Sequence, residues 1–411
     1  MSAPKAIQPL PLTGIRVIDY SHFLAGPHMS RCLSAMGAEV IKVERPKEGD
    51  AGRAHGYFKD GQSGYFLQQN MGKQGLCIDL KDSRGLAMLQ ELVKTADVFV
   101  ENYRPGALDK LGLGYAALSK LNPHLVYCSV SAYGHTGPDA AKAGFGLIAE
   151  AKSGAMAQVG NPGEAPPLLR MPIADMYTGV HGVAAICAAL VGRATSGKGQ
   201  HIDLALYDCM VSMHDYAVQR YTLSDGTDLP RQTGSGQPDS PIYGVFSGSD
   251  GYLVIAAQVD QAWNRLAQLI GGDELASDPR FAQPAGRAQN YAEATRIVEG
   301  WTKGQTVKQC LAALDAAEVP CSAVQTIDQV LADPQIHARN MVIEQDHPVL
   351  GKVRLPNLPF RFSDCNTTPK MPAPLLGQHN RSIAASLGYS EADIDTMVRD
   401  GVLYAEKAAL P

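Results

Sequence analysis

The first half of the chain alternates short apolar runs with segments of helical periodicity. GIRVIDY (14–20) and AEVIKVERP (38–46) are apolar runs of strand length, and HMSRCLSAMG between them carries apolar residues at helical spacing. Further runs of strand length are GLCIDL (75–80), ADVFVENY (96–103) and LVYCSVSAYG (125–134). Strands that alternate with helices indicate a parallel sheet wound by helices. The pattern therefore predicts an α/β fold with a Rossmann-like sheet.

The pattern changes near Cys209. An amphipathic stretch leads from there into SDGTDLPRQTGSGQPDSP, which is rich in turn-forming residues. The predicted organisation is a large domain over 1–208, a linker over 209–234, a small α+β domain over 235–335 and a C-terminal segment over 336–411. Because that segment is extended and Pro-rich before one last helix, we expect it to return to the large domain or to pack on a partner subunit.

One carboxylate lies between a short apolar run and a helix of small residues. In LLRMPIADMYTGVHGVAAICAALVG (168–192), Pro172 ends the preceding segment, and apolar residues then recur at helical spacing. Asp175 is therefore expected at or just before the N-terminus of this helix. Two roles are open from these residues alone. Asp is a good N-cap, worth about 1 kcal/mol, and its carboxylate can also act as a nucleophile.

Composition narrows the range of functions. The 411 residues carry a net charge of −5, and no basic run appears, which argues against nucleic-acid binding. The N-terminal segment has no apolar signal-peptide core, and no apolar run reaches the length of a membrane span, so we expect a cytoplasmic protein. The eight cysteines stand singly without metal-ligand spacing, which predicts buried thiols and no metal site.

The loop after the first predicted strand, 21–27, argues against a dinucleotide-binding enzyme. It holds one glycine, so the GxGxxG fingerprint of an NAD-dependent dehydrogenase is absent. The second predicted strand ends at Glu44, and Lys42, Arg45 and Lys47 surround that residue. These cations are either a solvated strand end or an anion site at the carboxyl edge of the sheet.

Seven separated stretches resemble the class III coenzyme A transferases, the family of formyl-CoA transferase and carnitine CoA-transferase, with α-methylacyl-CoA racemase as a sister group. They match in order over nearly the whole chain: LTGIRVIDYSHFLAGP, MGAEVIKVERPKEGD, ADVFVENYRPGALDKLGL, LNPHLVYCSVSAYGHTGP, TSGKGQHIDLALYD, EVPCSAVQTIDQVLADPQ and PLLGQH. The resemblance implies a large domain that the C-terminal tail completes. It also implies a homodimer whose chains are threaded through one another as linked rings.

The resemblance further implies residue roles. Asp175, in PIADMYTGVHG, corresponds to the aspartate that forms the family's covalent intermediate. The positions that match the family's CoA site are Leu24, Ala25, Arg45, Lys73, Asn102, Tyr103, Lys110 and Lys142. A glycine-rich loop that covers the active site in the family corresponds to Gly234, Ser235 and Gly236, and it is short here. CoA and acyl-CoA are implied as substrates, with no tightly bound cofactor.

Two positions depart from the family's patterns. Racemases have a proton-transferring histidine where this chain has Phe145, which cannot move a proton, so racemisation is disfavoured. Many transferases have an acidic residue where this chain has Gly146. The histidines nearest the matched loops are expected to be structural or at the surface: His22, His28 and His181. The candidates for contact with an acceptor carboxylate are Arg170, Tyr177, Gln237 and Tyr243.

These observations favour an acyl-CoA:carboxylate CoA-transferase that moves CoA from a donor such as succinyl-CoA to a small carboxylic acid. Asp175 would carry the group as an aspartyl anhydride and then as an aspartyl-CoA thioester. The first alternative is an acyl-CoA racemase or isomerase, which needs a second base facing Asp175. The second is a catalytically silent acyl-CoA-binding subunit, which an exchange assay distinguishes from an enzyme.

Overall fold

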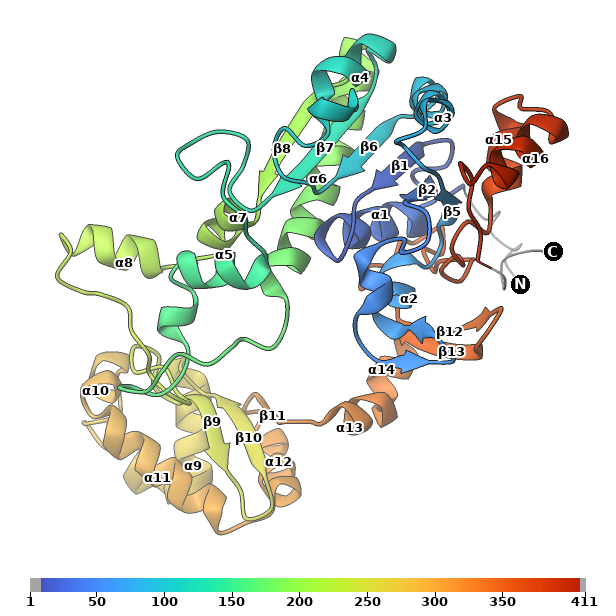
Figure 1. Cartoon of the computed structure of the whole chain (residues 1–411). Helices are drawn as coiled ribbons and strands as arrows, with labels where there is room; N and C mark the ends of the chain where they lie inside the picture. Colours follow the sequence, from blue (N-terminus) through green and yellow to red (C-terminus); the bar gives the residue numbers. More distant parts are fainter. Residues whose placement is uncertain (1–8, 407–411) are drawn as a thin grey trace. The chain divides into compact units, whose positions relative to one another are not determined.

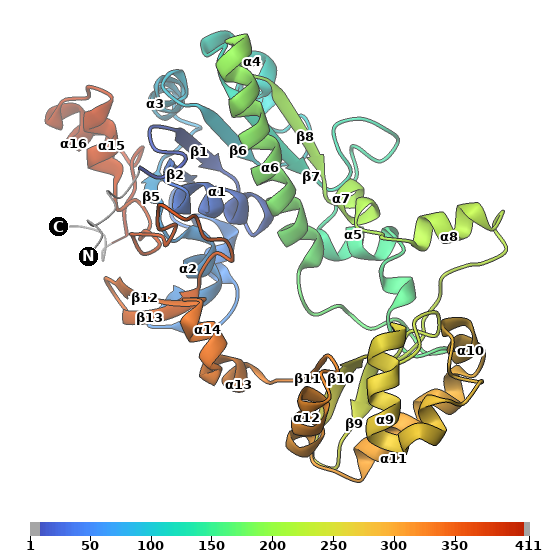
Figure 2. The same ribbon diagram turned by 180° about the vertical axis from the view of Figure 1, so that it is seen from behind.

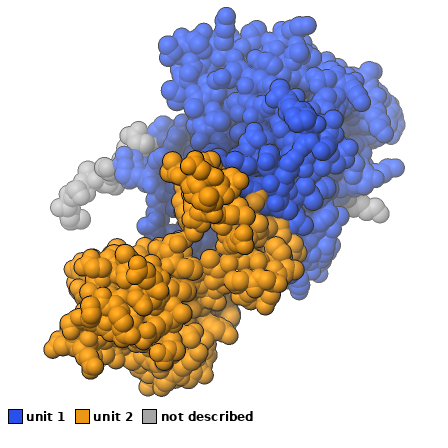
Figure 3. All heavy atoms as spheres, turned by 90° about the vertical axis from the view of Figure 1, so that its left-hand side faces the viewer, with its two compact units in different colours: residues 1–153, 170–214, 334–411 blue, residues 154–169, 215–333 orange. Residues whose placement is uncertain are grey.

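The computed structural model describes residues 9–406, and two compact units are distinguished, coloured separately in Figure 3. Unit 1 comprises residues 1–153, 170–214 and 334–411, and unit 2 comprises 154–169 and 215–333. The sequence placed segment 154–169 in the large domain, but it belongs to unit 2. Its hydrogen bonds explain the difference, since Gly234 N donates to Gly160 O at 3.0 Å.

Within the described residues, unit 1 is built on a parallel sheet of six strands (Figure 1). The strands are β1 (Arg16–Tyr20), β2 (Glu39–Glu44), β5 (Gln74–Cys77), β6 (Val98–Glu101), β7 (Val126–Ser131) and β8 (His201–Ala205). Their spatial order is β5-β2-β1-β6-β7-β8, the order that defines Rossmann folds. The predicted α/β class is confirmed. The strand order reverses between β1 and β6, and sheets of this type bind ligands at that point, outside the carboxyl ends of the strands.

Helices α1 (Ala25–Ala35) and α6 (Ile173–Ser196) lie side by side over one face of the sheet (Figure 2). Their backbones approach closely because α6 carries glycines at the contact. A Cβ on Gly182 would lie 2.0 Å from Met29 Cε, and a Cβ on Gly179 would lie 2.9 Å from His28 Cδ2. The small residues of α6 thus allow it to pack directly against α1.

The opposite face packs against α3 (Ser83–Lys94), α4 (Tyr115–Leu121), α15 (Asn380–Ser386) and α16 (Glu391–Arg399). The buried core there joins Ile18 and Phe99 of the sheet to Leu89, Ile383 and Met397 of these helices. Cys77 N donates to Asn380 Oδ1 at 2.8 Å, which ties the C-terminal tail to the edge strand β5. The tail therefore completes the large domain, as the resemblance implied.

The remaining elements of unit 1 are η1 (Ala51–Ala54), β3 (Phe58–Lys59), β4 (Gln62–Ser63), α2 (Gly64–Asn70), η2 (Asp109–Leu111), α5 (Gly146–Lys152), α7 (Leu206–Ser212), α14 (Pro334–Ala338), β12 (Val342–His347) and β13 (Gly351–Pro356). Unit 2 contains η3 (Met156–Gln158), α8 (Ala217–Leu223), β9 (Tyr243–Ser247), β10 (Tyr252–Ala256), α9 (Asp260–Ala276), α10 (Pro284–Gln289), α11 (Tyr291–Lys303), α12 (Val307–Ala316), β11 (Cys321–Ala323) and α13 (Ile327–Ala332). Strands β9 to β11 form an antiparallel sheet, and the core beside it contains Trp263.

The Pro-rich segment 355–362 packs on its own chain. Leu358 is buried against Cys32 and Ala35 of α1. Leu355, at the end of the β12–β13 hairpin, packs against Phe66 of α2. Unit 1 therefore covers part of this segment, whereas Phe362 at its end is 43% exposed.

By length and composition, α6 is the one helix among the described residues that could cross a membrane. The sequence had suggested no such span. In the structure, α6 packs along α1 and α7 and against β7 and β8. Those contacts are the ones that a core helix of an α/β layer makes.

Candidate active site

Asp175 lies in the first turn of α6 and is half-buried. The helix begins at Ile173 with Pro172 in the capping position, so Asp175 lies at the helix start as expected but does not cap it. Proline has no side-chain acceptor, and Glu150 of α5 supplies one: its Oε1 accepts a hydrogen bond from Ala174 N at 3.2 Å. Because another helix provides the cap, the carboxylate of Asp175 is left available for chemistry.

The Asp175 carboxylate receives no hydrogen bond from any of the described residues. Its Oδ2 lies against the backbone of Gly146, the first residue of α5, where an added Cβ would come within 2.1 Å of Oδ2. A side chain at position 146 would therefore displace the carboxylate. In this chain, the glycine at the position that departs from the family pattern leaves room for the Asp175 carboxylate.

Burial, and secondly the charge of Glu150, raise the pKa of Asp175 from 3.8 to about 6. Glu150 itself is 3% exposed, so water screens its charge poorly. Tyr65 of α2 lies in the field of the same carboxylate, because burial and then the charge of Asp175 raise the pKa of its phenol. Near pH 7, Asp175 is thus an anion with little stabilisation from water or hydrogen bonds, a state that suits a nucleophile.

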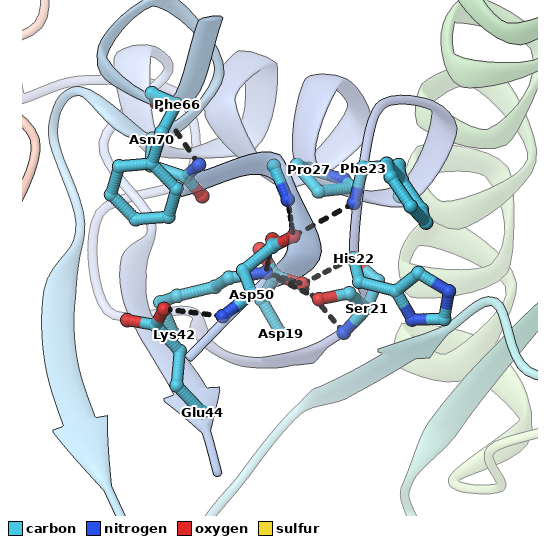
Figure 4. Close-up of polar contacts among 12 residues, drawn as sticks. Asp19, Ser21, His22, Phe23, Pro27, Lys42, Glu44, Asp50, Phe66 and Asn70 are labelled. Atoms are coloured by element: carbon cyan, nitrogen blue, oxygen red, sulfur yellow. Dashed lines mark hydrogen bonds and ion pairs between the residues drawn. The ribbon is translucent and has the colours of Figure 1, made fainter. Parts of the chain in front are cut away.

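A row of aromatic rings leads from the first loop to the start of α5. The rings of Tyr103 and His22 are 4.8 Å apart, and those of His22 and Phe23 are 5.1 Å apart. Phe23 continues the row to Phe145, at 6.0 Å. Phe23 has a left-handed φ of 62°, and its N–H donates to Asp50 Oδ1 at 2.9 Å (Figure 4). A non-glycine residue held in this strained conformation is typical of a functional loop.

A buried network of charges lies beside this loop (Figure 4). Lys42 Nζ pairs with Asp50 Oδ2 at 2.7 Å, and Lys73 Nζ pairs with Asp19 Oδ2 at 2.8 Å. Burial raises the pKa of Asp19, but the charges of Lys42 and Lys73 outweigh that effect and hold the pKa below its usual range. Removing one partner of such a pair would leave a buried uncompensated charge, so the network is expected to hold the loop in place.

Lys73 does not fit the CoA site that the sequence predicts. It has no exposed surface, its ammonium group donates to three acceptors within unit 1, and burial lowers its pKa to about 8. In this arrangement its side chain cannot reach a bound phosphate. The family pattern singles out Lys73, but in the structure its ammonium group donates to Asp19 Oδ2, Pro27 O and Asn70 Oδ1.

Other predicted CoA residues do meet at the point where the strand order reverses. Arg45 and Tyr103 line a cavity of about 130 Å³ together with His22. Asn102 holds the loop after β1 through two hydrogen bonds with His22. His22 N donates to Asn102 Oδ1 at 2.8 Å, and Asn102 Nδ2 donates to His22 O at 2.7 Å. His22, which the sequence suggested to be structural or at the surface, therefore belongs to this candidate binding pocket.

The rest of the predicted set is dispersed. Leu24 and Ala25 are buried at the start of α1, so only their main chain could meet a ligand. Lys110 and Lys142 are exposed and do not line this cavity, and Lys142 pairs with Asp139.

The glycine-rich loop lies in unit 2. Gly234, Ser235 and Gly236 line a cavity of about 570 Å³ that Gln237 and Tyr243 also line. Two main-chain hydrogen bonds anchor the loop, from Gly234 N to Gly160 O at 3.0 Å and from Val245 N to Ser235 O at 2.8 Å. Two of the four acceptor candidates thus share a cavity with the loop, whereas Arg170 and Tyr177 belong to unit 1. Closure of this loop over Asp175 remains a prediction.

The site combines a Rossmann-type sheet with a half-buried aspartate in the first turn of a helix. The model of CoA-transferase family III matches residues 12–380. The chain belongs to this family. It is a CoA-transferase, and the resemblance stated from the seven sequence stretches is confirmed.

The alignments with similar proteins span nearly the whole of this CoA-transferase. It is 34% identical to succinyl-CoA:glutarate CoA-transferase of Mus musculus over 395 residues, which cover 96% of this chain and 90% of that protein. It is 36% identical to succinate–glutarate CoA-transferase of Agrobacterium fabrum, with 92% and 96% covered. A CAIB/BAIF family protein from Brucella suis shares the fold with a TM-score of 0.83 and 38% identity, over 92% of this chain and 100% of that one.

The sequence patterns do not single out three residues of this candidate site: Phe23, Tyr65 and Glu150. Tyr65 lies in a helical stretch without a chemical motif. Phe23 lies inside the matched stretch LTGIRVIDYSHFLAGP, but its side chain carries no titratable or nucleophilic group. Glu150 did leave a signal, because GLIAEAK, which forms the whole of the short helix α5, places one acid among apolar residues. In the part of the chain that the structure describes, no group of three or more His, Cys, Asp or Glu is placed to hold a metal ion.

Proposed function

We propose that this enzyme moves CoA from an acyl-CoA donor, such as succinyl-CoA, to a small carboxylic acid through a covalent bond to Asp175. The observation that carries the proposal is the Asp175 carboxylate itself, half-buried in the first turn of α6 and without a hydrogen-bond donor among the described residues. The names of the mouse and Agrobacterium relatives include glutarate, which supports a dicarboxylic acid as the acceptor.

The chemistry requires a relay because a free carboxylate and a thioester do not exchange CoA directly without competition from water. The Asp175 carboxylate attacks the acyl carbonyl, the C–S bond breaks, and an aspartyl anhydride and CoA thiolate form. The thiolate then attacks the aspartyl carbonyl, which releases the donor acid and leaves an aspartyl-CoA thioester. The acceptor acid repeats these steps in reverse, so that no proton or electron is gained or lost overall.

A covalent adduct on Asp175 is the direct test of this function. Enzyme incubated with succinyl-CoA and no acceptor should gain the mass of an acyl or CoA group on the peptide that contains Asp175, and hydroxylamine should release it. The Asp175→Asn variant, treated in the same way, should stay unmodified. An adduct that maps to another residue would identify a different nucleophile and refute the proposal.

The pocket that Arg45 and Tyr103 line is proposed to hold a phosphate-bearing part of CoA. Arg45 is exposed, and its guanidinium is 3.7 Å from its neighbour Glu48, so the cation is accessible to a ligand. Arg45→Ala should raise the KM for the CoA ester about tenfold with little change in kcat, because a phosphate contact remote from the reacting carbon acts equally in ground and transition states. Steady-state kinetics with succinyl-CoA measures this. An unchanged KM would remove Arg45 from the site.

A homodimer is proposed because large apolar side chains are exposed, and not because the C-terminal tail needs a partner to bury it. Large apolar side chains at the start of α5, before α6 and within α6 are exposed: Phe145 is 65% exposed, Met171 66% and Val180 55%. Exposed large apolar side chains favour a protein cover, and the family resemblance implies an interlocked partner. Sedimentation at micromolar concentration should therefore show a dimer. A stable, active monomer would contradict this proposal.

A further inference from the structure

Glu150 stands out among the buried acids of unit 1 because it contacts the helix that carries Asp175. Its Oε1 accepts from Ala174 N at 3.2 Å, the residue directly before Asp175, and it is 3% exposed. It lies on α5, whose first residue, Gly146, touches Asp175 Oδ2. One short helix thus provides both the backbone surface against which the carboxylate lies and a second carboxylate behind it.

We propose that Glu150 is a positioning residue of the transfer reaction: it caps α6 in place of Asp175, and its negative charge favours the neutral, covalently modified forms of Asp175 over the free anion. The inference rests on the proposed function, because it assumes that Asp175 forms the anhydride and the thioester. Glu150 touches neither substrate in this assignment and acts through Asp175 alone.

The physical argument follows from the charges. The N-terminal amides of a helix stabilise an anion, and Glu150 uses that stabilisation, so Asp175 receives no such bond from Ala174. Glu150 is buried, Asp175 is half-buried, and their helices pack together, so the two negative charges repel each other. Acylation of Asp175 removes its charge and therefore the repulsion, and the negative charge leaves with the CoA thiolate or the released acid. Glu150 thus destabilises the reactant form of the nucleophile more than its ester-like products.

Other charged groups on elements packed against α6 do not share this role. They are His28 and Arg31 on α1, Lys152 on α5, Asp208 on α7, and His201 and Asp203 on β8. Lys152 pairs with Asp139, and the Arg31 guanidinium bonds to Pro356 O. Burial lowers the pKa of His28 to about 4, so it is neutral at pH 7. Among the described residues, Glu150 is the charged group whose field raises the pKa of Asp175, and the phenol of Tyr65 is the uncharged group from α2 in the same field.

The test separates the charge of Glu150 from its cap. Glu150→Gln keeps an oxygen that can accept from Ala174 N and removes the charge, whereas Glu150→Ala removes both. The rate of adduct formation on Asp175 from succinyl-CoA is measured by mass spectrometry between pH 4.5 and pH 8. In the wild type this rate should fall below about pH 6, as Asp175 becomes protonated. In Glu150→Gln the fall should move to lower pH, and less of the enzyme should be present as covalent adduct at equilibrium.

Thermal unfolding provides the second readout. Glu150→Gln should unfold close to the wild-type temperature, and Glu150→Ala should unfold at a lower one because α6 loses its cap. Glu91→Gln is the matched control, since Glu91 is an exposed glutamate of α3 on the opposite face of the sheet. An adduct whose pH profile does not move in Glu150→Gln, or moves equally in Glu91→Gln, would overturn this inference alone. No adduct in the wild type would refute the covalent mechanism, and this inference with it.

Discussion

Asp175→Asn is expected to abolish CoA exchange while making the fold more stable near pH 7. The amide is nearly isosteric but is not a nucleophile, so the rate of exchange should fall by about 10³-fold or more. The stability gain follows from the raised pKa. A carboxyl whose pKa rises from 3.8 to about 6 on folding binds more protons in the folded state, so stability is lost as pH rises between these values. Above pH 6 the ionised form costs up to about 3 kcal/mol, which the amide avoids.

The measurement pairs an exchange assay with urea unfolding at pH 5 and pH 7.5. The stability difference between Asp175→Asn and the wild type should be larger at pH 7.5 than at pH 5. Asp208→Asn is the matched control, because Asp208 is an exposed acid in the first turn of α7 and should show neither effect. If Asp175→Asn remained fully active without deamidation, Asp175 would not be the nucleophile. If it were less stable at pH 7.5, the raised pKa would be wrong.

Gly146→Ala should produce the second largest effect. The added methyl group would lie 2.1 Å from Asp175 Oδ2 and 3.1 Å from its Cγ, so the carboxylate has to rotate or α5 has to shift. Displacement of a reacting group by about 1 Å costs about 10²-fold in rate, and the loss should appear in kcat more than in KM for the CoA ester.

Gly192→Ala is the control for the general effect of alanine in a helix. Gly192 lies in α6, and a Cβ there would meet nothing within 4 Å. This variant should retain full activity and be slightly more stable, because alanine loses less backbone entropy than glycine on folding. Equal activity of Gly146→Ala and the wild type would show that the carboxylate does not react from the position seen here.

The capping of α6 and the pairing of Lys73 share one physical cause. The spacing around Asp175 places it near a helix start, but which residue caps that helix depends on Glu150, 25 positions earlier in the chain and brought close only when α5 packs on α6. The partner of Lys73 is also remote from it in the sequence. Its position before a strand marks it as a site residue in the family pattern, yet Asp19 meets its ammonium group because β5 and β1 flank β2 in the sheet.

The sequence by itself determined the α/β class, the family and the candidate nucleophile. Apolar periodicity and contiguous motifs involve residues that are close together in the sequence, so they can be recognised without the tertiary structure. Only the tertiary structure decided the order of the strands, the burial of Lys73, the tight fit of Gly146 against Asp175 and the capping by Glu150. Each of these depends on distances between residues remote along the chain. Those distances arise when the helices pack on the sheet, and no local pattern of side chains encodes them.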